Sequence, residues 1–138
     1  MAPVFGEGKT WRPGSGWFPP LKIVVCPTVR AADGLALSSR NQYLSPAQRK
    51  EAACIYRSLV EAGEMIKAGC KNPKTIIAKM RKIIEATETL KGIDYISIVN
   101  ADTLENPGRI SGKVLIAVAA RFGRTRLIDN LIVDTRSR

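Results

Sequence analysis

The sequence contains no histidine, only three cysteines and 6% aromatic residues. Without histidine, the chain has no imidazole that could act as a general base, a metal ligand or a phosphate contact, so we expect no self-contained catalytic triad. The cysteines Cys26, Cys54 and Cys70 are odd in number and unevenly spaced. This pattern fits neither a disulfide framework nor a zinc site, and we expect three reduced thiols in the core and no protein-bound metal.

Long hydrophobic runs are also missing. No uninterrupted apolar stretch approaches the roughly 20 residues that a membrane-spanning helix needs. The first twenty residues are rich in proline and glycine, and they lack the apolar segment and cleavage site of a secretory signal. We therefore expect a cytoplasmic protein without membrane contacts. With 138 residues, 45% of them apolar, the chain has room for one domain with a single core.

Acidic residues are few relative to basic ones, 12 against 22, which gives a net charge of +10. Such a balance favours a polyanionic partner, either a nucleic acid or a nucleoside triphosphate. A small basic nucleic-acid-binding module is therefore one candidate function, and Trp11, Trp17 and Phe18 support it because aromatic side chains can stack on bases. The sequence holds no recognisable nucleic-acid-reading motif, which counts against it.

The N-terminal region lacks the periodicity of a helix or strand. Residues 1–22 are interpreted as an irregular leader or an artificial extension, and residues 136–138 as a tail. Ile23–Cys26 is a short β-branched run that Pro27 ends, which predicts a buried strand. The stretch that follows, as far as Leu44, is predicted to be a loop.

Two helices are predicted after this loop. The first begins at Ser45, with Gln48 completing a capping box, and ends at Gly69. Its buried face is predicted to contain Ala52, Ile55, Leu59, Ala62 and Ile66. The second begins at Asn72 and ends at Gly92, with the apolar stripe Ile76, Met80, Ile83, Ile84, Thr87 and Leu90. Its basic residues are interpreted as a solvated surface: Lys74, Lys79, Arg81 and Lys82.

The last part of the chain changes to a period of two residues. The segments Asp94–Asn100, Val114–Ala120 and Arg126–Val133 are predicted to be strands, with turns between them. Because a short connection joins the two helices, they should pack antiparallel. The predicted fold class is α+β, an antiparallel helix pair packed on a small three-stranded antiparallel sheet.

The chemistry of the chain is concentrated in the predicted loop between Arg30 and Asn41. Small residues there let a ligand approach the backbone, Ser38 and Ser39 offer hydroxyl donors, and the guanidinium of Arg40 can bind phosphate oxygens in pairs. These are the components of an anion clamp. The same residues are also ordinary turn formers, so the pattern alone leaves both interpretations open.

Two motifs resemble a known family. The run Val29–Asn41, followed by Tyr43–Pro46, and the later run Ala119–Asn130 are similar to the C-terminal half of the pantothenate synthetase family. The resemblance extends over about Ile23–Val133. It implies that residues 23–135 form the C-terminal, lid-like domain of an ATP-dependent ligase.

That family joins pantoate to β-alanine with ATP and magnesium, through a pantoyl adenylate. The resemblance implies that Leu37 lies against the adenine, that the backbone of Val29 contacts the base, and that Ser38, Ser39 and Arg40 hold phosphate oxygens. Arg40 would act electrostatically, because negative charge builds on the departing pyrophosphate. Mg²⁺ would be held with the triphosphate, without a ligand from this chain.

The sequence also lacks what the family carries in its preceding half. The nucleotide-binding domain with its histidines and the pantoate pocket do not occur here, so the partners expected are ATP and that absent domain. Pantoate and β-alanine are expected to bind only the complete enzyme, and we predict that the isolated chain makes no pantothenate. Arg121, Arg124 and Arg126 could form a second phosphate site, but internal polar contacts that fix the sheet are favoured for Arg126 and Asp129.

Overall fold

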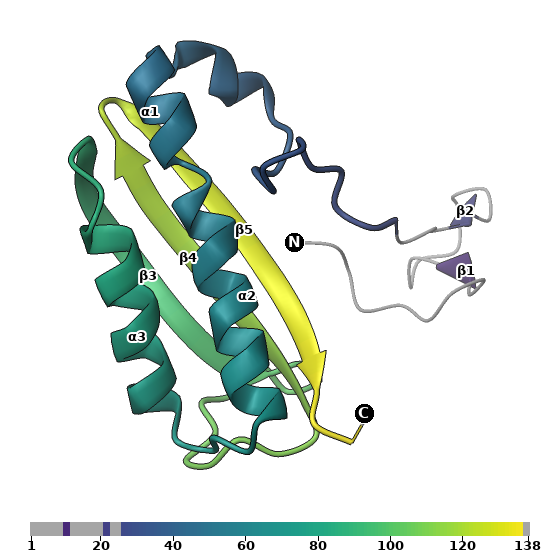
Figure 1. Cartoon of the computed structure of the whole chain (residues 1–138). Helices are drawn as coiled ribbons and strands as arrows, with labels where there is room; N and C mark the ends of the chain where they lie inside the picture. The colour runs from purple at the N-terminus through teal and green to yellow at the C-terminus, as the bar shows by residue number, and fades with distance from the viewer. Residues whose placement is uncertain (1–9, 12–20, 23–25, 137–138) are drawn as a thin grey trace.

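The computed structural model of the protein describes residues 10–11, 21–22 and 26–136. Figure 1 shows an α+β arrangement of two layers, in which two antiparallel helices cover one face of a sheet. The elements are β1 (Thr10–Trp11), β2 (Leu21–Lys22), the 3-10 helix η1 (Ser39–Tyr43), α1 (Pro46–Glu51), α2 (Cys54–Lys67), α3 (Pro73–Glu85), β3 (Leu90–Asn100), β4 (Lys113–Phe122) and β5 (Thr125–Asp134). The predicted fold class is confirmed.

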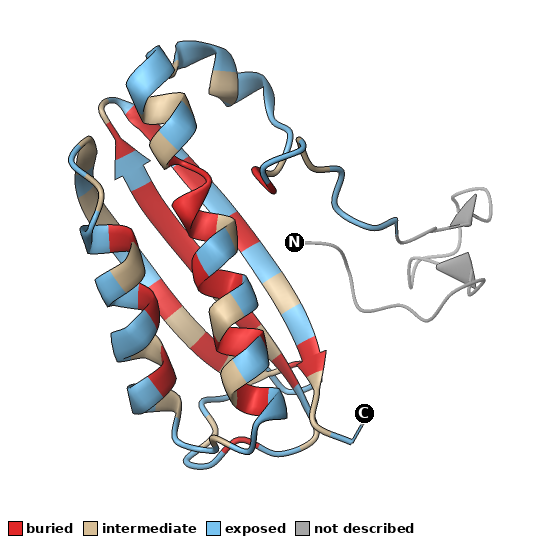
Figure 2. Ribbon diagram, viewed as in Figure 1, coloured by how far each residue is buried: buried red, intermediate tan, exposed pale blue. Residues whose placement is uncertain are grey.

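The sheet has the order β3-β4-β5 with both pairings antiparallel. Because side chains alternate along a strand, every second residue of β4 faces the helices. The residues of β4 that are fully buried in this way are Val114, Ile116, Val118, Ala120 and Phe122. Figure 2 shows the same alternation in β5, where buried and exposed positions follow one another. The helices contribute the other half of a single core.

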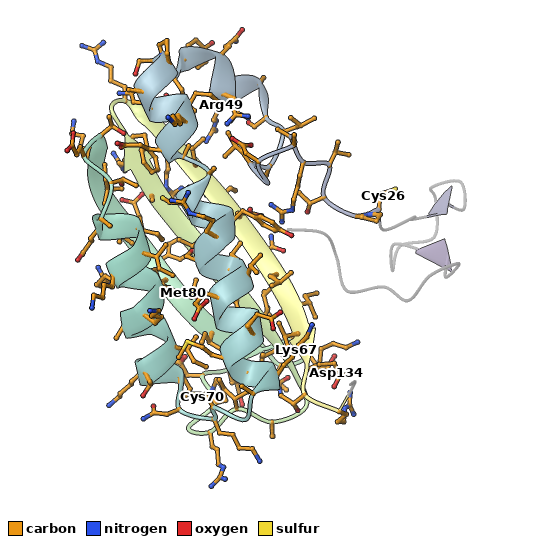
Figure 3. The ribbon with its side chains drawn as sticks, viewed as in Figure 1. Cys26, Arg49, Lys67, Cys70, Met80 and Asp134 are labelled. Atoms are coloured by element: carbon orange, nitrogen blue, oxygen red, sulfur yellow. The ribbon has the colours of Figure 1, made fainter. Side chains whose placement is uncertain are left out.

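Most of the helical residues predicted to be buried form that core, whereas Ile83 and Thr87 of the second stripe are only half-buried. Ala52, Ile55, Leu59, Ala62 and Ile66 are all buried, and so are Ile76, Met80 and Ile84. Figure 3 shows Met80 pointing inward from α3. The predicted antiparallel pairing of the two long helices is correct, and Gly69, with φ of 105°, ends α2 as expected. The amide of Cys70 donates to the carbonyl of Met65, and that of Gly69 to Ile66, which satisfies the last turn.

The first predicted helix is wrong in one respect, because it is divided into α1 and α2. The capping box at Ser45 and Gln48 is present. At Ala52 and Ala53 the backbone keeps helical dihedral angles, but the amide of Ile55 bonds to Ala52, three residues back. This tighter turn separates the short α1 from α2, and both alanines in it are buried.

The predicted end of the second helix is also wrong. Helix α3 ends at Glu85, and Leu90 begins β3 instead of closing a helical stripe. The hydroxyl of Thr87 donates to the carbonyl of Ile84 over 2.7 Å. The amide and hydroxyl of Thr89 both bind the carboxylate of Glu51, and these bonds lower the pKa of that group. Side chains at the end of α3 thus take over the hydrogen bonding that would continue the helix.

The cysteines differ from one another. Cys54 is buried, Cys70 is half-buried, and Cys26 is exposed and belongs to no strand, so the prediction of three core thiols is wrong for Cys26. Figure 3 shows Cys26 far from the helices. Ile23, Val24 and Val25 of the predicted first strand lie outside the described residues, as do Trp17 and Phe18. Among the helices that the structure describes, none has the length and apolar character to cross a membrane.

Candidate functional site

The predicted anion-binding loop begins as a narrow hairpin. The amide of Ala31 donates to the carbonyl of Leu35, and the amide of Leu37 donates to the carbonyl of Val29, each over 2.9 Å. Leu35 is buried in the core, whereas Val29 and Leu37 are 67% and 58% exposed. The hairpin therefore anchors itself through one leucine and presents two apolar side chains outward.

A glycine and an aromatic ring set the shape of the hairpin tip. Gly34 has φ of 95°, and a Cβ atom added there would lie 2.1 Å from the ring of Tyr56. Only glycine combines this backbone conformation with so close an approach. The neighbouring Asp33 accepts two hydrogen bonds from Arg49, which hold the pKa of its carboxyl below the usual value. The tip is thus fixed to both α1 and α2.

An ion pair fixes the base of the hairpin to the sheet. Arg30 donates to both carboxylate oxygens of Asp129, with N–O distances of 2.6 and 3.0 Å, and also to the carbonyl of Gly34. Its guanidinium lies 4.1 Å from the centre of the Tyr56 ring, within the range of a cation–π contact. The side chains of Arg30 and Asp129 are 17% and 5% exposed, so solvent screens this pair only weakly.

The segment that follows the hairpin carries the predicted phosphate contacts. Ser38 caps η1, and its hydroxyl oxygen accepts a hydrogen bond from the amide of Arg40 over 3.2 Å. Its O–H hydrogen stays available as a donor. Ser38, Ser39 and Arg40 are all exposed, and within the described residues Arg40 forms no ion pair. A permanent charge without a carboxylate partner is suited to an anionic ligand.

A pocket of about 270 Å³ lies between this segment and β5. Its apolar wall includes Leu35, Leu37 and Ile128, and its polar groups include Arg40 and Asn41. The amide nitrogen of Asn41 donates to the carbonyl of Ala36, but the buried oxygen Oδ1 has no partner within the described residues. A buried acceptor without a partner is costly, so a donor from a ligand or from water would stabilise it.

The structure brings three of the five predicted site residues together around this pocket. Leu37, Ser38 and Arg40 line it, whereas Val29 and Ser39 lie outside its lining. The sequence alone gave Asn41 no separate role, and the ATP-binding roles of the five predicted residues stay predictions. Asn41 belongs to the run Ser-Ser-Arg-Asn, but only the structure shows that its amide nitrogen bonds to the carbonyl of Ala36 and that its oxygen is buried without a partner within the described residues.

The β4–β5 hairpin places more arginines beside the same segment. Arg121 and Arg126 face each other in the register, and both donate to the carboxylate of Asp94 on β3. The hydrogen bond from Arg126, over 2.6 Å, is the chief cause of a lowered pKa at Asp94. The internal contacts predicted for Arg126 and Asp129 are therefore present, with Asp94 and Arg30 as their respective partners.

The basic residues of α3 lie around its exposed side. Lys74, Lys79, Arg81 and Lys82 are all exposed, and Arg81 lies 3.6 Å from Glu85 one turn further along. The buried stripe of α3 occupies the opposite side. This arrangement is a solvated surface, as predicted.

Comparison with known proteins identifies the family. The model of the pantoate-beta-alanine ligase family matches residues 17–132. The chain belongs to this family. The pantothenate synthetase of Acetivibrio thermocellus is 54% identical over 117 residues, which are 83% of this chain and 40% of that protein. The pantothenate synthetase of Syntrophomonas wolfei is 52% identical over 115 residues, with the same shares covered.

A solved structure extends the similarity to the fold. The pantothenate synthetase from Thermus thermophilus matches with a TM-score of 0.73 and 39% identity, over 80% of this chain and 39% of that one. This chain thus spans about 40% of the length of the pantothenate synthetases it matches. The family match begins at residue 17, ahead of Ile23, so it includes part of the stretch interpreted as a leader.

Proposed function

We propose that residues 23–135 are the C-terminal, lid-like domain of an ATP-dependent ligase that condenses pantoate with β-alanine through a pantoyl adenylate. The observation that carries the proposal concerns Arg40. Its side chain is exposed, has no carboxylate partner among the described residues, and lines a pocket beside an anchored loop. Membership in the pantoate-beta-alanine ligase family supports the choice of this reaction.

The loop would hold the nucleotide from one side. Leu37 offers an exposed apolar surface to the adenine ring, and the amide of Val29, which has no hydrogen-bond partner within residues 26–136, is free to contact the base. The hydroxyls of Ser38 and Ser39 would donate to phosphate oxygens. Because Ser38 uses only its acceptor capacity in capping η1, it can fulfil both roles.

The chemical contribution of the loop is electrostatic. When the pantoate carboxylate attacks the α-phosphate, negative charge grows on the departing pyrophosphate, and a fixed cation lowers the energy of that state. Arg40 supplies the cation and needs no proton transfer, because a guanidinium stays charged at all relevant pH values. Mg²⁺ would accompany the triphosphate; within the described residues no group of three acidic, cysteine or histidine side chains could hold it.

The remaining parts of the reaction belong to other residues of the complete enzyme. This chain holds no histidine, and it corresponds to about 40% of its relatives. The pantoate and β-alanine sites and the second side of the triphosphate clamp would come from the portion that it does not cover. Alone, the chain should bind ATP weakly and make no pantothenate.

A titration of ATP and magnesium into isotope-labelled protein tests the proposal. Chemical shifts of residues 29–41 should change on addition of ATP, and Arg40→Ala should reduce the affinity. Arg109→Ala is the matched control, because Arg109 is also exposed but adjoins Ile110, whose amide bonds to Lys71 at the other end of the domain. An equal loss of ATP affinity in both variants, or chemical-shift changes confined to α3, would contradict the proposal. Shifts on α3 with an oligonucleotide would favour nucleic-acid binding instead.

A second experiment tests the ligase assignment. The chain is mixed with a fragment of a complete relative that carries the residues this chain does not cover. Synthesis of pantothenate should require both parts and should fail with Arg40→Ala. Product formed by the chain alone would contradict the proposed division of the site.

A further inference from the structure

A second groove, of about 650 Å³, opens beside η1 on the side of the β4–β5 turn. Three arginines line it, Arg40, Arg124 and Arg126, together with the hydrogen-bonding side chains of Tyr43, Gln48 and Thr125. Among the described residues that line it, none is acidic. Three guanidiniums around a space without a carboxylate create a strongly positive potential there.

The groove adjoins the pocket already described. Arg40 and Arg126 line both cavities, so these two side chains form the boundary between them. The first cavity has an apolar wall, and the second adds Arg124 to the two arginines that both cavities share. A ligand with an apolar end and a polyanionic end could therefore extend from one cavity into the other across this boundary.

Arg126 has hydrogen-bonding capacity left. Its Nε donates to Asp94, but neither terminal nitrogen has a hydrogen-bond partner within the described residues. Arg121 lies opposite it and shares the same carboxylate, so a single negative charge faces two positive ones. Like charges directly opposite on neighbouring strands repel each other, and an added anion would relieve that repulsion.

The turn that carries Arg124 is held in place. Gly123 has φ of 61°, and a Cβ atom added there would lie 2.5 Å from Nε2 of Gln48. The other end of that amide, Oε1, accepts from the amide of Ser45 in the capping box of α1. Figure 1 shows the β4–β5 turn and α1 at the same end of the domain, and Figure 3 labels Arg49 of α1 there. Arg124 lies in the turn between the paired residues Phe122 and Thr125, and it forms no ion pair within residues 26–136.

We propose that the β4–β5 hairpin supplies a second polyphosphate-binding group, in which Arg124 and the free end of Arg126 act with Arg40. The ligand class is a diphosphate or triphosphate, either the outer phosphates of a nucleotide or released pyrophosphate. The inference rests on the proposed function and extends it, because it assigns the outer phosphates to this hairpin and leaves the nucleoside to the first pocket.

Inorganic pyrophosphate is the probe that tests the hairpin separately from the nucleoside pocket. Titrated into the folded chain, it should shift the amides of residues 123–126 as well as Arg40. Arg124→Gln should weaken its binding by about tenfold, the loss expected for one charge-assisted contact. Arg109→Gln is the control, because it removes the same charge at the other end of the domain. Equal weakening in both variants would overturn the proposal.

Asp94→Asn distinguishes ligand binding from a merely structural role of the arginines. This substitution removes the competing carboxylate, so pyrophosphate should bind more tightly although the sheet loses two ion pairs. Unchanged or weaker binding by the folded variant would overturn the proposal.

The outcomes also separate the two proposals. If ATP perturbs residues 37–41 while Arg124→Gln leaves pyrophosphate affinity unchanged, the hairpin site is wrong and the proposed function stands. If neither ligand perturbs residues 37–41, both proposals fail. If pyrophosphate and ATP compete for binding, and Arg124→Gln lowers the affinity for each of them, both proposals are supported.

Discussion

Arg30 and Asp129 lie 99 positions apart in the sequence and form a two-pronged ion pair at the base of the candidate site. Each residue belongs to one of the two motifs that resemble the pantothenate synthetase family. The pair therefore gives a physical reason for the two motifs to occur together. One motif offers the loop and the other holds that loop against the sheet.

Removing this tether should destabilise the domain. Asp129→Asn leaves the guanidinium of Arg30 without its charge partner in a largely buried position, which costs about 3 to 5 kcal/mol in free energy of unfolding. Amide hydrogen exchange should accelerate for residues 29–37 more than for β4. Urea denaturation and hydrogen exchange measure the two effects, and Asp134→Asn, which breaks an exposed pair with Arg136, serves as the control. An equal loss of unfolding free energy in both variants would show that burial of the Arg30–Asp129 pair is unimportant.

Replacing the glycine at the hairpin tip should disturb the loop from its other side. In Gly34→Ala the added methyl group meets the ring of Tyr56, and the backbone conformation becomes unfavourable by about 1 to 3 kcal/mol. Displacement of the ring would also weaken its contact with Arg30. Gly108→Ala is the control, because nothing lies within 4 Å of its added Cβ. Thermal unfolding should separate the two variants, and similar melting temperatures would contradict the prediction.

Acid should weaken the domain partly through Asp94. The hydrogen bonds from Arg126 and Arg121 lower the pKa of this carboxyl in the folded state below its ordinary value of 3.8. The unfolded state consequently binds the proton more tightly, so this contribution to stability is present above pH 3.8 and is lost as the pH falls through the lowered pKa. In urea titrations, the stability of Asp94→Asn should fall less than that of the natural chain as the pH is lowered below 3.8. Parallel pH curves would contradict this account.

The three thiols should react at different rates. Cys26 is exposed and should react with a disulfide reagent at once, Cys70 more slowly, and Cys54 only on unfolding. Burial raises the pKa of the Cys54 thiol to about 11, so little thiolate is present near neutral pH. The variant Cys26→Ser should lose the fast phase of labelling. A fast phase that persists in this variant would show that a second thiol is accessible.

The periodic parts of the fold were predictable because burial repeats along the sequence. The stripe Ile55, Leu59 and Ile66 correctly predicted a helix, and the apolar run Val114–Ala120 correctly predicted a strand. The end of α3 was not predictable in this way. Thr87 and Leu90 continue the helical spacing in the sequence. The helix ends before them where Thr89 binds Glu51, which lies 38 positions earlier and could not be identified as its partner from the sequence.

The candidate site was predictable in its residue types but not in its geometry. Ser38, Ser39 and Arg40 were identified from local chemistry, and the structure places them on the surface, where a ligand can reach them. The partners of Arg30 and Arg126 could not be assigned. Asp129 and Asp94 are distant in sequence from these arginines. The register of the sheet brings Asp94 to Arg126, and the packing of the hairpin against β5 brings Arg30 to Asp129.

The anchors of the loop have a consequence for the order of assembly during synthesis. Asp129, which binds Arg30, and Gly123, which lies close to Gln48, come far after the loop in the sequence and leave the ribosome long after the loop itself. Until the last hairpin has formed, the loop lacks these two contacts, whereas α2 and α3 can already pair as neighbours in sequence. Ribosome-stalled chains that stop before residue 123 should therefore contain paired helices and a loop that proteases still cut.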